Sequence, residues 1–251
     1  MAEPEQLRVL PVLDLPEFDA EMSIGAEIAA RAELADGDVV VVSQKVVSKA
    51  EGRVRRLSSV TPGDEARRLA AALGKEPALV QLILDESREV LRAERGILIT
   101  ETHHGFVCAN AGIDRSNLPE PGTVALLPED PDASARRIRA ELQASADGRV
   151  AVVVSDSFGR AWRLGQSEVA IGCAGLVPLD DWRGRADAEG RELEATAIAV
   201  ADEAAAAADL VRDKANRVPA AVVRGLRHFV TTEDGPGGAA LRRPPDEDLF
   251  R

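Results

Sequence analysis

The stretch VVVSDSFGRAWRLGQSEVAIG, residues 152–172, combines residue types that can handle a metal ion and a phosphate. A strongly apolar run leads directly into Asp156 and Ser157, and Arg160 and Arg163 follow. Carboxylates at the end of a buried strand are frequent metal ligands, and paired guanidinium groups can hold carboxylates or phosphates. The alternative is a structural ion pair between Asp156 and one of the arginines. We predict a metal site at Asp156 that serves a phosphorylated ligand.

A second polar segment, NAGIDRSNLP at residues 110–119, follows an apolar stretch. Asp114, Ser116 and Asn117 supply hard oxygen ligands and amide donors, which Mg²⁺ and Mn²⁺ prefer and commonly share with substrate phosphates. An ordinary loop built on an Asx-turn explains the same composition. On its own, the segment fits both interpretations.

The third segment is SQKVVSKAEGR at residues 43–53, directly after the apolar run DVVVVS. α/β proteins usually bind ligands at the carboxyl ends of their strands. Lys45 and Lys49 are four residues apart, so on a helix their ammonium groups share a face and can meet phosphate oxygens. A solvated helix start is the alternative, because lysine-rich turns are common.

Composition excludes several classes of partner and site. The sequence contains neither G-x-x-x-x-G-K-[ST] nor G-x-G-x-x-G, the common nucleotide-binding motifs. A formal net charge of −12 and an aromatic content of 3% argue against a nucleic-acid partner, because such a protein repels phosphate backbones and lacks rings for base stacking. His103 and His104 are adjacent and predict a surface turn rather than a metal pair.

Cys108 and Cys173 lack metal-binding spacing, so we expect both to be reduced core residues. The N-terminus has early acidic residues and no basic region, which does not fit a signal peptide. No apolar run approaches the roughly 20 residues that span a bilayer. We therefore expect a cytoplasmic protein without a membrane partner.

Hydrophobic periodicity predicts alternating strands and helices that would position these segments, and hence an α/β or α+β fold with a mixed sheet. The expected strands are 7–13, 38–43, 96–100, 106–110, 149–155 and 219–223. The expected helices are 23–34, 61–74, 77–93, 132–145 and 189–211. Gly159 would let the chain turn after the strand at 149–155. A shift to Gly, Pro, Asp and Arg after His228 predicts one domain over residues 1–228 and a tail or linker over 229–251.

These segments, in this order, resemble the coenzyme F420:L-glutamate ligase family (F420-0:gamma-glutamyl ligase). The matching stretches are LPVLDLPEF at 10–18, VVSQKVVSKAEGR at 41–53, NAGIDRSNLP at 110–119, SDSFGRAWRLGQSEVAIG at 155–172 and, more weakly, PAAVVRG at 219–225. The resemblance implies a two-lobed, mixed-sheet ligase domain that forms an intertwined homodimer.

The resemblance also implies an activity and its cofactors. Such enzymes attach L-glutamate through its amine to the terminal carboxylate of coenzyme F420-0 and can add further glutamate by a gamma link. They use GTP, two Mg²⁺ or Mn²⁺ ions and K⁺. The expected partners of this chain are therefore GTP, L-glutamate and coenzyme F420-0.

Several site residues follow from the matching positions. The resemblance implies metal binding by Asp114, Asp156 and Ser157, where the family usually has Thr at the last position. The implied GTP contacts are Leu15, Pro16, Glu17, Phe18, Gln44, Lys49 and Asn117; the family often has Ser in place of Gln44. Arg160 and Arg163 are our own candidates for holding substrate carboxylates, chosen for their charge.

The sequence departs from the family near its last match. Some members have a metal-binding Gln where Lys214 stands, and an ammonium group cannot ligate a cation. Actinobacterial relatives continue into a flavin-binding domain. The sequence therefore fits either a stand-alone enzyme or the N-terminal domain of a larger one, and we expect no flavin here.

The chemistry that these residues suggest is phosphoryl activation of a carboxylate. We hypothesise that the substrate carboxylate attacks the γ-phosphate of GTP, with metals on Asp114 and Asp156 neutralising the developing charge. The glutamate amine then displaces phosphate. Two alternatives are a Mg²⁺-dependent phosphatase or phosphotransferase with Asp156 as nucleophile, and a non-catalytic GTP-binding module.

Overall fold

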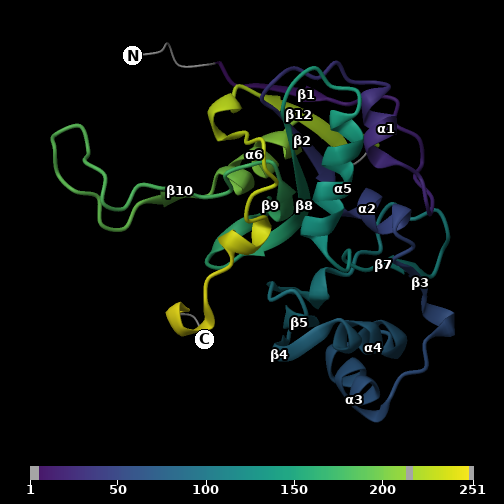
Figure 1. Ribbon diagram of the computed structural model, residues 1–251. Helices are drawn as coiled ribbons and strands as arrows, with labels where there is room; N and C mark the ends of the chain where they lie inside the picture. The colour runs from purple at the N-terminus through teal and green to yellow at the C-terminus, as the bar shows by residue number, and fades with distance from the viewer. Residues whose placement is uncertain (1–5, 213–216, 249–251) are drawn as a thin grey trace.

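A computed structural model describes residues 6–212 and 217–248 of the chain. It has a mixed α/β fold, as predicted (Figure 1). Within the described residues the largest sheet has five strands in the order β1-β12-β2-β8-β9, in which β2 and β8 are parallel and the other neighbours antiparallel. These strands are β1 (Arg8–Pro11), β2 (Asp38–Ser43), β8 (Val150–Arg160), β9 (Arg163–Ala174) and β12 (Ala220–Arg224).

The two central strands are apolar on both faces because helices cover both sides of the sheet. Val40 and Val152 face a cluster that includes Ile138 of α5, whereas Val39 and Val153 face the alanines of α6. Strands buried in this way read as nearly continuous runs of valine, and the predicted strands at 38–43 and 149–155 are confirmed. The covering helices are α1 (Ile24–Ala29), α2 (Gln44–Ala50), α5 (Pro131–Gln143) and α6 (Val200–Asp209).

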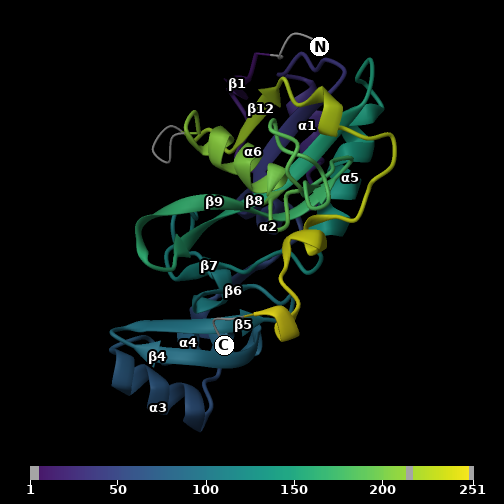
Figure 2. The ribbon, with the colours of Figure 1, turned by 90° about the vertical axis from the view of Figure 1, so that its left-hand side faces the viewer.

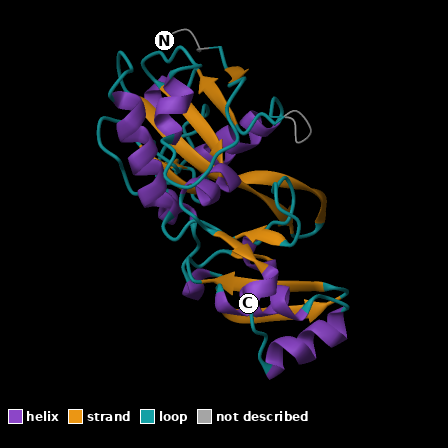
Figure 3. Cartoon of the chain, turned by 90° about the vertical axis from the view of Figure 1, so that its right-hand side faces the viewer, coloured by secondary structure: helices purple, strands orange, loops and turns teal. Residues whose placement is uncertain are grey.

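Residues 64–109, called here the satellite region, form a second layered unit below the main sheet in Figures 1–3. A sheet in the order β4-β5-β6 packs against two helices around a separate apolar cluster that contains Ile83 and Leu98. Its elements are α3 (Asp64–Leu73), α4 (Pro77–Asp85), β4 (Ser87–Glu94), β5 (Ile97–Thr102) and β6 (Val107–Ala109). The predicted strands at 96–100 and 106–110 are present as β5 and β6, and the two are antiparallel neighbours.

The predicted helix over residues 77–93 is wrong in its second half. Helix α4 ends at Asp85, and Ser87–Glu94 forms strand β4 beside β5. Within this strand, Val90 pairs with Thr100 of β5. The cross-strand partners come from later in the chain, so the local pattern of residues does not reveal them.

The predicted helix over residues 189–211 is also too long. Helix α6 begins at Val200, and the preceding residues form an extended hairpin around β10 (Asp180–Asp181) and β11 (Ala197–Ile198). This hairpin leaves the body of the molecule as a long arm on the left of Figure 1. Backbone hydrogen bonds such as Trp182 N–H to Thr196 O, at 2.9 Å, hold the arm together, so helical hydrogen bonds cannot form there.

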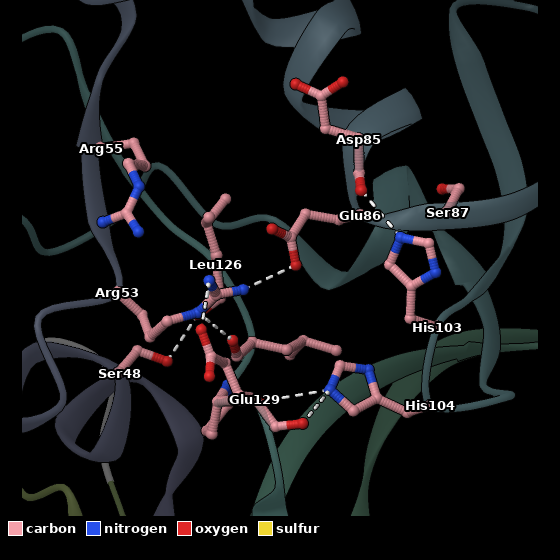
Figure 4. Close-up of polar contacts among 12 residues, drawn as sticks. Ser48, Arg53, Arg55, Asp85, Glu86, Ser87, His103, His104, Leu126 and Glu129 are labelled. Atoms are coloured by element: carbon pink, nitrogen blue, oxygen red, sulfur yellow. Dashed lines mark hydrogen bonds and ion pairs between the residues drawn. The ribbon is translucent and has the colours of Figure 1, made fainter.

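The five-stranded sheet, its covering helices and the adjoining loops are called here the main sheet region. A cluster of polar contacts, shown in Figure 4, joins the satellite region to it. Arg53 donates to the Leu127 carbonyl at 2.9 Å and forms ion pairs with Glu86 at 2.7 Å and Glu129 at 3.4 Å. The Nε2 atom of His104 lies 2.8 Å from the Pro128 carbonyl. The small sheet of β3 (Val54–Arg56) and β7 (Thr123–Ala125) lies in the same connecting zone.

Residues after the predicted boundary at 228 contact the main sheet region. Val230 is buried and forms a bridge with Leu176. Asp234 pairs with the buried Arg139 at 2.6 Å. The short 3-10 helices are Leu57–Ser59, Asn110–Gly112, Arg227–Phe229, Gly238–Leu241 and Pro245–Glu247.

Cys108 and Cys173 are free and buried, as expected. Burial raises the pKa of each thiol to about 12, so neither is an activated nucleophile. Across the described ranges 6–212 and 217–248, no helix has the length and apolar character needed to cross a membrane.

Candidate active site at the carboxyl ends of the central strands

A cavity of about 560 Å³ lies where the parallel strands β2 and β8 end. Ser43 pairs with Ser155 in the register, so the residues that follow them emerge side by side. Open α/β sheets bind ligands at this edge. The lining residues with polar or charged side chains are Glu17, Ser43, Gln44, Lys45, Lys49, Asp114, Ser116, Asn117, Asp156, Ser157, Glu168, Asp209, Arg212 and Arg217.

Asp114 reaches this cavity from the loop between β6 and β7. Its backbone forms an isolated bridge with Ala125, and its carboxylate accepts hydrogen bonds from the Ser116 backbone at 2.7 Å and from Lys45 at 2.7 Å. Burial acts to raise its pKa, but the hydrogen bonds from Lys45 and Ser116 prevail and hold the pKa below its usual value. The Asx-type turn is therefore present, and it presents the Asp114 carboxylate to the cavity.

Asp156 lies on β8, where two other acids of the cavity act on its carboxyl. Burial first, and then the negative charges of Glu168 and Asp114, raise its pKa to about 7. A divalent cation would supply the positive charge that such a carboxyl lacks. The oxygen-only donor set of Asp114, Asp156 and Ser157 suits Mg²⁺ or Mn²⁺, so the residues fit the predicted metal.

Two lysines of α2 face the same cavity, as the four-residue spacing predicted. Lys45 contacts Asp114 and Ser116, and Lys49 forms an ion pair with Glu17 and donates to the Asn117 carbonyl at 3.2 Å. These contacts bring the start of α2 together with two loops that are distant in sequence. The ammonium groups reduce the negative potential of the acids, as a phosphate ligand requires.

Two buried nitrogen atoms of the lining residues have no hydrogen-bond partner among the described parts of the chain: Nε2 of Gln44 and Nη1 of Arg212. Gln44 uses its Oε1 atom to accept a hydrogen bond from Ser48 at 2.7 Å. An unpaired buried donor typically lowers the stability of the fold by about 1–3 kcal/mol. Hydrogen-bond acceptors on a bound ligand would remove that loss.

Ser155, Ser157, Glu168 and Arg212 form a hydrogen-bonded group beside Asp156. Glu168 accepts hydrogen bonds from Ser155 at 2.6 Å and Ser157 at 2.5 Å, and pairs with Arg212 at 2.7 Å. Sequence reasoning missed Glu168 and Arg212. An acidic residue within the apolar end of β9 was the available signal for Glu168, whereas nothing in the sequence around Arg212 marked it.

The loop of Leu15, Pro16, Glu17 and Phe18, between β1 and α1, also lines the cavity. The loop follows β1, which is an edge strand of the sheet. The ion pair between Glu17 and Lys49 nevertheless brings it beside α2. All seven residues that we expected to contact the nucleotide therefore border one cavity. Lys214 lies outside the described residues.

Arg160 and Arg163 lie elsewhere. Strand β8 continues through Gly159 to Arg160, and the chain turns at Trp162, not at Gly159 as predicted. Both arginines are exposed at the tip of the β8–β9 hairpin and do not line the cavity of this chain. Arg160 donates to the Leu164 carbonyl at 2.7 Å.

Comparison with known proteins shows which family the chain resembles. The family model described as F420-0:Gamma-glutamyl ligase matches residues 13–225. The chain is 44% identical to the coenzyme F420:L-glutamate ligase of Methanothermobacter thermautotrophicus over 243 aligned residues. The alignment covers 96% of each chain. It is 41% identical to the enzyme of that name from Methanocaldococcus jannaschii, over 95% of each chain, and 42% identical to that from Methanopyrus kandleri, over 99% of this chain and 95% of the relative.

Proposed function

Because this chain belongs to the F420-0:gamma-glutamyl ligase family and is a ligase, we propose that it joins L-glutamate to coenzyme F420-0 in a reaction driven by GTP. The bond formed is an amide between the glutamate amine and the terminal carboxylate of the coenzyme. Further glutamates are added through gamma links. The observation that carries the proposal is the meeting of Asp114 and Asp156, 42 residues apart in number, in one cavity beside two lysines.

Activation of the carboxylate is the step that needs the nucleotide. A carboxylate does not react with an amine near neutral pH, because an oxide would have to leave. The substrate carboxylate attacks the γ-phosphorus of GTP, and GDP leaves. The resulting acyl phosphate then reacts with the neutral glutamate amine, which forms the C–N bond and releases phosphate and a proton.

The residues of the cavity have separate tasks in this scheme. Asp114, Asp156 and Ser157 hold the divalent cations, which would neutralise charge on the phosphates when bound. Lys49 steadies the phosphates, and the unpaired amide of Gln44 donates to the nucleotide. The loop Leu15–Phe18 and Asn117 complete the nucleotide contacts. K⁺ is an additional expected ion, for which we assign no ligand.

Arg160 and Arg163 remain candidates for carboxylate binding, although they are remote from this cavity. A role for them requires that the hairpin tip reach a substrate from outside, as in a homodimer whose second chain lies near it. We therefore propose a homodimer with a two-lobed subunit, which sedimentation velocity with wild-type protein tests. A monomer under turnover conditions would contradict this part of the proposal.

Mass spectrometry of the reaction products tests the proposed activity. The protein is mixed with GTP, Mn²⁺, L-glutamate and coenzyme F420-0, and the coenzyme should gain one or more glutamyl units. With coenzyme labelled by ¹⁸O in its terminal carboxylate, one labelled oxygen should appear in the released phosphate. Phosphate release without glutamate would instead favour a phosphatase, and GTP binding without any turnover would favour a non-catalytic module.

A further inference from the structure

We propose that Glu168 is a positioning residue that orients the Ser157 hydroxyl toward the bound cation. Glu168 lies on β9 directly opposite Ser157 in the strand register. Its Oε1 atom accepts the Ser157 hydroxyl hydrogen at 2.5 Å. The inference rests on the proposed function, since it assumes that Ser157 ligates a metal.

A hydroxyl that ligates a cation must present a lone pair of its oxygen. Its hydrogen then has to point to a fixed acceptor on another side. Glu168 is such an acceptor, and it is buried. Groups that orient metal ligands from behind are typically worth about 10–100-fold in metal affinity.

The other oxygen of Glu168 explains why the carboxylate stays in place. Oε2 accepts hydrogen bonds from Ser155 at 2.6 Å and from Arg212 at 2.7 Å, and Arg212 also donates to the Ser155 hydroxyl at 3.0 Å. Arg212 is buried as well and supplies the compensating charge. Turning Glu168 toward a cation would break these contacts, so the geometry assigns it to orientation rather than to ligation.

The isosteric variant Glu168→Gln makes a sharp test. The surrounding groups, Ser155, Ser157 and Arg212, all donate to Glu168, whereas an amide offers one acceptor oxygen. With that oxygen held by Arg212, the amide NH₂ faces Ser157 and uses a lone pair of its hydroxyl. The hydroxyl hydrogen then loses its fixed acceptor, so one lone pair is taken up by the amide and nothing holds the other toward the cation.

The measurement is a Mn²⁺ titration by electron paramagnetic resonance, with the full chain and GTP present. Glu168→Gln should weaken Mn²⁺ binding about 10–100-fold. Ser157→Ala should weaken it comparably, and adding Glu168→Gln to Ser157→Ala should cause less than about a twofold further loss, since the two changes act on one interaction. Independent effects that multiply in the double variant would overturn the assignment. So would the loss of one Mn²⁺ per chain in Glu168→Gln alone, which would make Glu168 a ligand.

Two control variants separate the proposed role from an effect on folding. Glu168→Leu combined with Arg212→Met removes both charges, a change that often leaves stability nearly unaltered. This double variant should weaken Mn²⁺ binding as much as Glu168→Gln does. Asp234→Asn takes the acidic partner from another buried arginine, Arg139, and should leave Mn²⁺ affinity unchanged. If the wild-type chain itself binds no Mn²⁺, the proposed function fails; if it binds and Glu168→Gln binds equally well, only this inference fails.

Discussion

The main sheet region and the satellite region differ in how they bury their strands. Strand β2 is enclosed by helices on both faces, and Val39 to Val42 are completely buried. Strand β4 lies at the edge of its sheet, and all of its residues are exposed or half-buried. The residues that line the cavity come from the main sheet region and the loops beside it. Enclosure on both faces thus gives the site a rigid support and gives the sequence an unambiguous strand signal.

Asp156→Asn should have the largest effect, and it acts on the main sheet region alone. We expect turnover to fall by at least about a hundredfold, because an amide neutralises the principal charge that holds the cation. Steady-state kinetics with GTP, glutamate and coenzyme F420-0 measure this loss. An active variant that binds Mn²⁺ normally would refute the role of Asp156.

The same variant should stabilise the metal-free protein at alkaline pH. The pKa of Asp156 is raised from 3.8 to about 7 in the fold, so its contribution to stability is complete below pH 3.8 and is lost as the pH rises through about 7. Asn carries no charge at any pH. Thermal unfolding without metal at pH 8 should therefore show a higher midpoint for Asp156→Asn than for wild type, and a lower midpoint would contradict the buried, repelled carboxylate.

Matched cavity variants compare the two cores. Leu142→Ala in the main sheet region and Leu98→Ala in the satellite region both truncate completely buried leucines. Each should cost about 2–5 kcal/mol of unfolding free energy. Urea unfolding measures these free energies. Hydrogen exchange of Leu98→Ala should be faster for the amides of residues 64–109, while the amides of β2 and β8 stay protected. Equal loss of protection in both regions would mean that they unfold as one unit.

Glu86→Gln should weaken the connection between the two regions. Arg53 and Glu86 are largely buried, so losing the carboxylate leaves the guanidinium with the more exposed Glu129 and the Leu127 carbonyl. We expect a loss of about 1–3 kcal/mol of stability, measured by urea unfolding. Glu129→Gln is the matched control and should cost less than about 1 kcal/mol, because the Glu129 side chain is exposed. Equal losses would contradict the central place of the Arg53–Glu86 pair.

His104 should produce the smallest effect, as a pH dependence. Burial, the largest influence, lowers its pKa, although the carbonyls of Pro128 and Glu129 act in the opposite direction. The unfolded chain then binds more protons, so stability is complete above about pH 6.5 and falls as the pH drops through the lowered pKa. Chemical unfolding between pH 5 and 8 should show a shallower decline for His104→Gln; identical slopes would exclude His104 as the cause.

The sequence carried enough information for most of the cavity. Asp114, Asp156, Ser157, Lys45 and Lys49 each follow an apolar strand or share a helix face, and the structure gathers all five around one cavity. Each could be predicted because the strand or helix turn that places it is defined by neighbouring residues. The parallel pairing of β2 and β8 then aligns their ends.

Other features depend on partners far along the chain. Glu168 matters because β9 folds back on β8, and Arg212 matters because α6 ends beside them. Residues 87–93 and 189–198 were predicted as parts of helices, but they lie in hairpins instead. Arg160 and Arg163 were chosen for their charge, but Arg160 ends the strand that carries Asp156 and Arg163 begins the next one, and an extended strand moves successive residues away from its base by about 3.3 Å each.

Crystallography with Mn²⁺ and a non-hydrolysable GTP analogue tests the central claim most directly. Anomalous scattering should place Mn²⁺ between the carboxylates of Asp114 and Asp156 and against the phosphates of the analogue. Manganese bound outside this cavity, or a nucleotide whose phosphates avoid both carboxylates, would contradict the account.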